Sequence, residues 1–217
     1  MARGRMALRV KRCLDVVGAA AALAALSPAL LAVALTLRIT QGAPILYRQR
    51  RPGLRGRSFL LLKFRTMRAP RPGEVWFRSE VDRLTPLGRF LRISSLDELP
   101  ELWNVLRGEM SLVGPRPLLP EYLEAYTAEE RRRHDVRPGI TGWAAVNGRN
   151  ATPFRERLAL DVWYVDHWSL GLDLRILTRT LVQVVRRDGA AAFEDSKALG
   201  FPVERLDPRG PRREEVR

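Results

Sequence analysis

The sequence predicts an α+β fold that is mainly helical and carries an N-terminal membrane hairpin made of two helices. Three features of the 217-residue chain predict it: an apolar stretch interrupted by Ser27-Pro28, a strand–turn–strand pattern over 45–67, and several amphipathic helical patterns after residue 85. A chain of this length can bury a hydrophobic core. We expect an anchor over 1–40, a globular domain over 41–188 and a poorly ordered tail over 189–217.

The charge balance points to anionic partners. The chain has 38 Lys and Arg side chains against 24 Asp and Glu, a formal net charge of +14. This excess suits lipid headgroups, phosphates or nucleic acid, although an Arg-rich composition can also reflect the base composition of a genome. Cys13 is the only cysteine, which rules out an intrachain disulfide and favours a reducing compartment.

The apolar stretch from Val16 to Leu37 is uncharged and long enough to cross a membrane. As a straight helix it would extend roughly 33 Å, against a hydrocarbon core of about 30 Å, so a spanning helix is the simplest interpretation. Pro28 counts against it, because proline has no N–H to donate and its ring clashes with the carbonyl of Ala24. The hydroxyl of Ser27 can bond to the backbone that Pro28 leaves free.

Basic residues flank this stretch on both sides, and positive flanks prefer the cytoplasm. A break at Ser27-Pro28 gives two arms of about 16 Å each, enough to reach the middle of the bilayer and return. We therefore expect a re-entrant hairpin with both ends in the cytoplasm. The flanking residues are Arg3, Arg5, Arg9, Lys11 and Arg12 before the stretch and Arg38, Arg48, Arg50, Arg51, Arg55 and Arg57 after it.

Residues 45–67 have the pattern of two β-strands joined by a turn at Pro52-Gly53. In the second strand Lys63 and Arg65 share one face, about 7 Å apart. Two cations at this spacing suit a diphosphate, and the alternative is an ordinary solvated strand face.

The acidic pair Asp97-Glu98 opens the helix expected in SSLDELPELWNVLRGEM. Ser95 and Glu98 have the spacing of a capping box, and acidic residues stabilise a helix N-terminus, so a structural role alone would explain the pair. A functional role is the alternative. The apolar face of this helix comprises Leu99, Leu102, Trp103 and Leu106.

The rest of the chain predicts loops and further helices. GPRP (114–117) holds Arg116 in a stiff extended loop, and RPGITGW (137–143) is expected to be another loop. A helix starting at Thr152-Pro153 places Asp161 on an apolar face, where pairing with Arg157 or a nearby Arg competes with a functional role. The segment from Leu172 to Val185 predicts an amphipathic helix suited to anionic headgroups.

These residues favour one kind of chemistry. The sequence has neither a GxxxxGK[ST] nor a GxGxxG motif, and His134 and His167 are too few for a His-rich metal site. An Asp acting as nucleophile or Mg²⁺ ligand, with cations on the phosphate oxygens, would give phosphoryl-group chemistry through a carboxylate. The cations proposed for this role are Lys63, Arg65 and Arg116.

At this point the sequence resembles the bacterial sugar transferases, in particular the small monotopic phosphoglycosyl transferases. The resemblance extends over about Met6 to Arg187. It is carried by Ser27-Pro28, KFRTM (63–67), TPLGRFLRISSLDELPELWNVLRGEMSLVGPRP (85–117), RPGITGW (137–143), VNGRN (146–150) and LDVWYVDHWSL (160–170). The joint occurrence of these motifs is highly specific.

The resemblance implies a reaction and its residues. The enzyme would move a sugar-1-phosphate from a UDP-sugar to polyprenyl phosphate and release UMP, with Asp97 as the nucleophile and Mg²⁺ beside it. Glu98 would be its essential partner, and Lys63 and Asp161 would be required for activity. Arg116 and Arg149 would contact phosphate. Ala145 departs from the Gln that relatives often carry, which leaves the sugar or uridine contacts there open.

The resemblance also implies a setting. The enzyme would lie in the bacterial inner membrane with its catalytic domain on the cytoplasmic face, near anionic lipids, and would catalyse the first membrane step of glycoconjugate or polysaccharide assembly. The donor is expected to be an N-acetylated amino sugar or a deoxy derivative, with a plain hexose as the alternative. A homodimer is left open. A membrane-tethered nucleic-acid binder is disfavoured, because no nucleic-acid recognition motif is found. An inactive scaffold is disfavoured by the intact Asp97, Glu98, Lys63 and Arg116.

Overall fold

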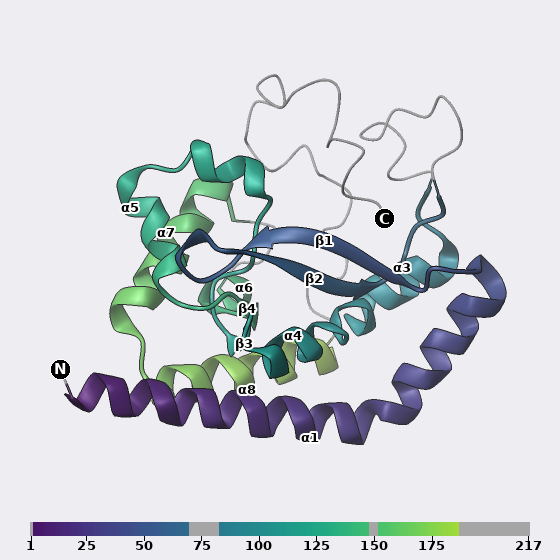
Figure 1. Ribbon diagram of the computed structural model, residues 1–217, viewed down its shortest axis with the longest axis horizontal. Helices are drawn as coiled ribbons and strands as arrows, with labels where there is room; N and C mark the ends of the chain where they lie inside the picture. The colour runs from purple at the N-terminus through teal and green to yellow at the C-terminus, as the bar shows by residue number, and fades with distance from the viewer. Residues whose placement is uncertain (1, 70–82, 148–151, 187–217) are drawn as a thin grey trace.

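The computed structural model describes residues 2–69, 83–147 and 152–186. The tail predicted over 189–217 therefore lies outside the described residues. A long helix, α1 (Ala2–Gln41), runs along one side of a domain built from short helices and two small sheets (Figure 1). The prediction of a mainly helical fold with a small sheet is confirmed.

The domain follows α1 along the chain. Its α-helices are α3 (Pro86–Ile93), α4 (Glu101–Arg107), α5 (Ala128–Arg131), α6 (Trp143–Val146), α7 (Phe154–His167) and α8 (Leu170–Arg186). Its 3₁₀ helices are η1 (Leu54–Gly56), η2 (Leu96–Glu98), η3 (Pro120–Glu124) and η4 (Arg132–Asp135).

Two strand pairs complete the domain. β1 (Leu46–Pro52) and β2 (Ser58–Phe64) form the expected antiparallel hairpin, in which Leu46 lies opposite Phe64. β3 (Ser111–Val113) pairs in parallel with β4 (Gly139–Thr141), although RPGITGW was expected to be a loop. Strands of three residues are too short to show an alternating pattern, so this pair could not be predicted from local pattern.

Helix α1 is continuous through Pro28, whereas the sequence predicted a break into two helices. Figure 1 shows the helix changing direction along its length, and a proline inside a helix is the usual cause of such a bend. The hydroxyl of Ser27 donates to the carbonyl of Ala24 at 2.8 Å, as expected for the acceptor that Pro28 leaves free. The element is therefore a bent helix rather than a helix–turn–helix.

Both halves of α1 contact the same domain. In the first half, Lys11 Nζ lies 2.6 Å from Asp173 Oδ2, and Arg12 donates to the carbonyls of Val105 and Leu106 at the end of α4. Two residues of the basic flank are thus bonded to the domain. In the second half, Leu37 is buried in a cluster that includes residues of β2 and α3, namely Phe64 and Leu91.

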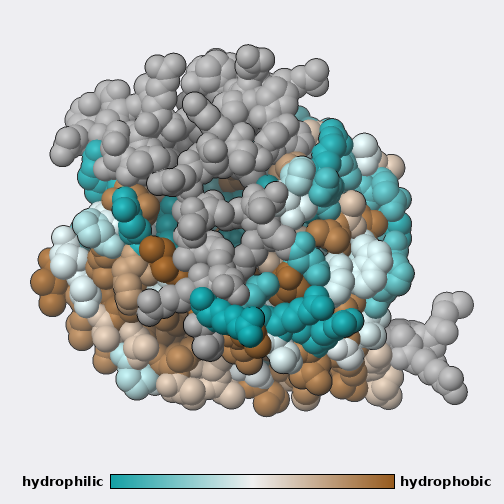
Figure 2. Space-filling view, turned by 180° about the vertical axis from the view of Figure 1, so that it is seen from behind, coloured by the Kyte–Doolittle hydropathy of each residue, from teal (hydrophilic) through white to brown (hydrophobic). Residues whose placement is uncertain are grey.

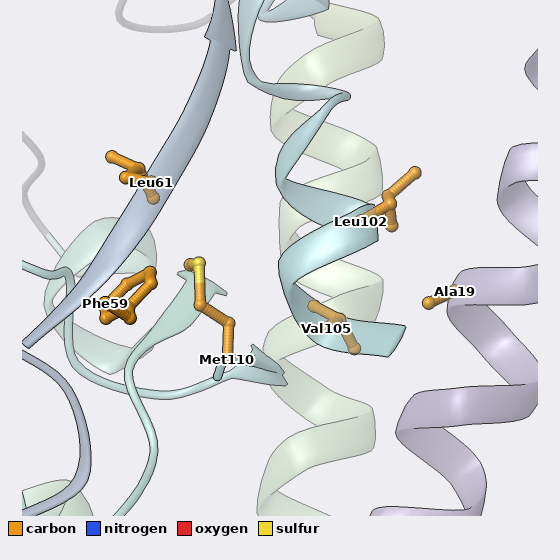
Figure 3. Close-up of a cluster of buried hydrophobic side chains, with 6 residues drawn as sticks. All are labelled: Ala19, Phe59, Leu61, Leu102, Val105 and Met110. Atoms are coloured by element: carbon orange, nitrogen blue, oxygen red, sulfur yellow. The ribbon is translucent and has the colours of Figure 1, made fainter. Parts of the chain in front are cut away.

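Helix α4 lies between α1 and β2 and forms the centre of the core (Figures 1 and 3). Figure 3 shows the buried cluster that joins the three elements. The cluster consists of Ala19, Phe59, Leu61, Leu102, Val105 and Met110.

The opposite side of α1 is apolar and exposed. Figure 2 shows apolar side chains along the lower edge of the molecule, where α1 runs in Figure 1. By length and composition α1 could cross a membrane. Exposed large apolar residues are Met6, Leu8, Val10, Leu14, Val17, Leu26, Leu31, Leu35 and Ile39 on α1, Phe90 and Ile93 on α3, and Leu174, Leu181, Val182 and Val184 on α8.

Candidate active site

The acidic pair lies in a tight connection between α3 and α4. Ser95 has the left-handed conformation (φ 56°), and η2 then carries Asp97 and Glu98. A capping serine needs an extended backbone, and Ser95 makes no capping bond with its side chain. The capping-box interpretation is therefore wrong for this pair.

Glu98 joins two of the predicted cations. Its Oε1 atom accepts from Lys63 Nζ at 2.7 Å and from Arg116 Nη2 at 2.6 Å. Lys63 Nζ also lies 3.2 Å from Oε1 of Glu101, a carboxylate that is only 3% exposed. Residues from β2, η2, α4 and the GPRP loop thus meet in one ionic cluster, which we call the Glu98 cluster (Lys63, Glu98, Glu101 and Arg116).

The carboxylates of the site differ in their protonation. Burial of Glu98 opposes its ionisation, but the charges of Arg116 and Lys63 outweigh it and hold the pKa of Glu98 well below its usual range. Burial, followed by the charge of Glu98, raises the pKa of Asp97 to about 6. Burial also raises the pKa of Glu101 to about 7, against the opposing charge of Lys63. Asp97 is therefore still mainly ionised at neutral pH, but its ionisation is less favourable than that of an exposed Asp.

Asp97 differs from Glu98 in its bonding. It is 8% exposed, and no donor in the described part of the chain forms a hydrogen bond or ion pair with its carboxylate. A carboxylate that is ionised, buried and unbonded is available to an incoming electrophile or cation. Unlike Glu98, Asp97 does not use its carboxylate to hold the described parts of the fold together.

The site offers limited means of holding a metal ion. Among the described residues, no group of three or more His, Cys, Asp or Glu side chains is placed to hold one. Mg²⁺ commonly binds through one or two carboxylates together with substrate phosphates rather than in a cage of protein ligands. Because Glu98 is engaged by two cations, Asp97 is the carboxylate that fits such a mode.

Arg116 is positioned by a buried ion pair. Its main-chain carbonyl accepts from Arg133 Nη2 at 2.7 Å, and the same nitrogen lies 2.6 Å from Oδ2 of Asp161 on α7. The side chains of Arg133 and Asp161 are 1% and 6% exposed. The pairing of Asp161 with a nearby Arg is confirmed, and it connects Asp161 to the site through the backbone of Arg116.

A close approach of the backbone also fixes the GPRP loop. A Cβ on Gly114 would lie 2.3 Å from the carbonyl oxygen of Arg137, so only glycine fits there. The loop that carries Arg116 is therefore held against the segment that leads into β4.

Arg65 was predicted to be a site residue but is not brought to the cluster. The guanidinium of Arg65 donates to the carbonyls of Gln41 and Gly42, at the end of α1. Because β2 ends at Phe64, strand alternation does not extend to Arg65, and the expected face shared with Lys63 is not formed. Arg149 lies outside the described residues.

The sequence missed a further cation of the site. Beside the Glu98 cluster lies a small open hollow. Arg51 on β1 lines it, although the sequence placed this residue only among the basic flank of α1. The pairing register of the predicted hairpin could have indicated that Arg51 lies on the same face as Lys63. The lining residues are Arg51, Leu61, Lys63, Glu101, Arg116, Pro117 and Leu118.

The long apolar helix α1 indicates a membrane-associated protein. Its domain carries a hollow lined by cations beside an unbonded carboxylate, a site suited to phosphate groups. Within that class, the chain belongs to the bacterial sugar transferase family, which it matches over residues 6–187. The family membership predicted from the motifs is confirmed.

The chain is similar to several proteins of this family. It is 48% identical over 180 residues to the uncharacterized sugar transferase EpsL of Bacillus subtilis, covering 83% of this chain and 89% of that protein. It is 45% identical over 190 residues to a UDP-glucose:undecaprenyl-phosphate glucose-1-phosphate transferase of Caulobacter vibrioides, covering 83% and 71%. It is 39% identical over 199 residues to an undecaprenyl-phosphate galactose phosphotransferase of Salmonella typhimurium, covering 83% and 41%.

Proposed function

We propose that this protein transfers a sugar-1-phosphate from a UDP-sugar to polyprenyl phosphate, with Asp97 as a covalent nucleophile. The observation that carries the proposal is the ionised, unbonded carboxylate of Asp97 next to the Glu98 cluster. The Caulobacter and Salmonella relatives, whose names give undecaprenyl phosphate as the acceptor, support the overall reaction.

The reaction proceeds in two displacements. An oxygen of Asp97 attacks the phosphorus that carries the sugar, the bond to the bridging oxygen breaks, and UMP leaves with the electron pair. A phosphate oxygen of the polyprenyl phosphate then attacks the same phosphorus, and the Asp97 carboxylate is released. The product is a polyprenyl diphosphate sugar, and neither displacement requires an oxidant.

The cations of the site stabilise the charge on the phosphoryl group in both displacements. Lys63 and Arg116 come from separate elements and share the counter-charge of Glu98, so a phosphate oxygen can replace part of that pairing. When bound, Mg²⁺ held by Asp97 and the diphosphate would neutralise charge on the substrate and favour departure of UMP.

The bent helix α1 supports a monotopic arrangement in the inner membrane, with the domain on the cytoplasmic face. Lys11 and Leu37 contact the same domain although they lie in opposite halves of α1, and a spanning helix would separate one half from it. The exposed apolar residues of α1, α3 and α8 would then face lipid, and basic residues would meet anionic headgroups. The lipid phosphate and the soluble nucleotide would meet at this interface.

The covalent step is tested with purified protein, Mg²⁺ and a panel of UDP-sugars in the absence of polyprenyl phosphate. The panel should include glucose, galactose and N-acetylated amino sugars. With the correct donor we expect release of about one equivalent of UMP per protein and a phospho-sugar adduct on Asp97, located by mass spectrometry. Full turnover with the lipid, but neither UMP nor adduct without it, would contradict the covalent mechanism.

A further inference from the structure

Arg51 lines the same hollow as Lys63 and Arg116 but has different partners. Its Nη2 atom donates to Oε1 of Gln49 at 2.6 Å, and its Nη1 atom donates to the carbonyl of Pro117 at 3.3 Å. Both acceptors are neutral. Among the residues that the structure describes, no carboxylate forms an ion pair with Arg51, whereas Lys63 and Arg116 are both paired with Glu98.

The surroundings of Arg51 leave part of its hydrogen-bonding capacity unused. Its Nε atom is buried and has no partner among the described residues. Burial, followed by the charge of Arg116, lowers the pKa of Arg51 to about 10, so the side chain is still a cation at neutral pH. The carboxylates of Glu121 and Glu101 offset only part of this effect and neither pairs with Arg51 directly, so an incoming anion would relieve the remaining cost of burying the cation.

The hairpin register explains why Arg51 faces the hollow. Arg51 pairs with Phe59 and Lys63 pairs with Tyr47, and residues directly opposite each other lie on the same face of an antiparallel pair. Because Phe59 and Lys63 are four residues apart on β2, Arg51 and Lys63 lie on one face. Arg50 points to the other face and is exposed, which makes it a matched control.

We propose that Arg51 binds the phosphate of the uridine nucleotide that leaves from Asp97, an inference that rests on the proposed function. A UDP-sugar carries one negative charge on each phosphate, and the transferred phosphate must lie at Asp97. Glu98 already pairs directly with Lys63 and Arg116, so Arg51, which forms no ion pair with a described carboxylate, supplies the cation for the neighbouring phosphate. A guanidinium can give two parallel hydrogen bonds to such a group.

The layers of the fold favour the nucleotide over the lipid as the source of this phosphate. Helix α4 lies between the β-hairpin and α1 (Figures 1 and 3). The phosphate of a polyprenyl lipid stays attached to a chain that lies in the apolar layer along α1. Arg51, on the hairpin, is on the far side of α4 from the first half of α1, and we expect a soluble nucleotide to reach it from that side.

Calorimetric titration with UDP tests the proposal without requiring the identity of the sugar. Full-length wild-type protein, Arg51→Gln and Arg50→Gln are titrated in detergent with UDP and Mg²⁺, and uridine is titrated as the phosphate-free probe. We expect the Kd for UDP to rise at least 10-fold in Arg51→Gln and less than twofold in Arg50→Gln. The affinity for uridine should be the same in all three proteins.

The outcomes separate Arg51 from the proposed function. Equal UDP affinity in wild-type protein and Arg51→Gln would overturn the assignment of Arg51 alone. A change confined to the KM for polyprenyl phosphate would assign Arg51 to the acceptor and also overturn it. Failure of the wild-type protein to bind UDP would overturn the proposed function itself. If Arg51→Gln melts well below wild type, Arg51→Lys is titrated in its place, because lysine keeps the charge. We then expect a UDP affinity between those of the wild-type protein and Arg51→Gln. Wild-type affinity for UDP and for uridine in both Arg51→Lys and Arg51→Gln would overturn the assignment.

Discussion

Lys63 and Glu98 are joined by an ion pair of 2.7 Å between Nζ and Oε1, although 35 residues separate them in the sequence. The pair connects β2 to η2 and so fixes the neighbouring Asp97 relative to the β-hairpin. Because Arg116 binds the same oxygen of Glu98, this carboxylate is the counter-charge of both cations before substrate arrives. A phosphate that enters the site competes with Glu98 for them.

The first prediction concerns Glu98→Gln. The neutral amide leaves Lys63 and Arg116 without a shared counter-charge, so both cations should be displaced from their positions beside Asp97. We expect UMP release to fall by at least about 100-fold and the free energy of unfolding to fall by about 1–3 kcal/mol. Glu129→Gln is the control, because Glu129 is 65% exposed and its one ion-pair partner among the described residues is surface Arg132. Normal turnover of Glu98→Gln would contradict the role of the cluster.

The second prediction is that Asp97→Asn abolishes UMP release but stabilises the protein. The pKa of Asp97 is raised to about 6 in the folded state, from 3.8, because burial and Glu98 disfavour its charge. The folded state therefore holds its proton more tightly, and the carboxylate reduces stability as pH rises through about 4 to 6. Above that window the neutral Asn should gain about 1–3 kcal/mol.

The measurement for Asp97→Asn is the melting temperature of both proteins at pH 4 and pH 7.5, with a chelator present to remove divalent ions. We expect the variant to melt higher than wild type at pH 7.5 and close to it at pH 4. A lower melting temperature of the variant at both pH values would indicate that Asp97 serves mainly to stabilise the turn.

The third prediction concerns Asp161, which contacts the backbone of Arg116 only through Arg133. Asp161→Asn leaves the charge of Arg133 buried without a partner, which should cost about 3–5 kcal/mol. The double variant Arg133→Met/Asp161→Leu removes both charges and should recover much of that stability. It also removes the hydrogen bond to the Arg116 carbonyl, so its kcat should stay at least about 10-fold below wild type.

The control for Asp161 is Asp166→Asn, which disturbs the surface pair of Asp166 with Arg132, both 39% exposed. This change should cost less than about 1 kcal/mol and leave kcat unchanged. Full recovery of kcat together with stability in the double variant would show that Asp161 is needed only for folding.

The sequence predicted the elements of the site better than their contacts. The motif around Asp97 and Glu98 and the hairpin with Lys63 could be placed because each depends on local pattern. Arg51 and Arg133 could not, because their roles depend on strand pairing and on a contact with α7. Arg65 was assigned to the site because alternation was extended beyond the end of β2.

The same limit applies to α1. Pro28 indicated an interruption, but the helix bends and stays continuous because the Ser27 hydroxyl bonds to the Ala24 carbonyl and both halves of α1 pack on the domain. Those contacts are made with residues far along the chain, which a local pattern does not contain.

The last prediction uses Cys13, which is exposed on α1 next to two residues bonded to the domain. Lys11 pairs with Asp173 and Arg12 donates to carbonyls at the end of α4, so Cys13 must lie on the same side of the membrane as the domain. In oriented vesicles, we expect an impermeant maleimide to label Cys13 only from the face on which a C-terminal tag is digested by protease. Labelling from the opposite face would contradict the re-entrant arrangement.

Pro28→Ala restores an N–H for the Ala24 carbonyl and removes the ring clash, which favours a straight helix. A straight α1 would lose the packing of Leu37 on Leu91, so we expect a lower melting temperature and some molecules with the two ends on opposite faces. Ser27→Ala keeps the proline and is the matched control: it should retain the wild-type labelling pattern.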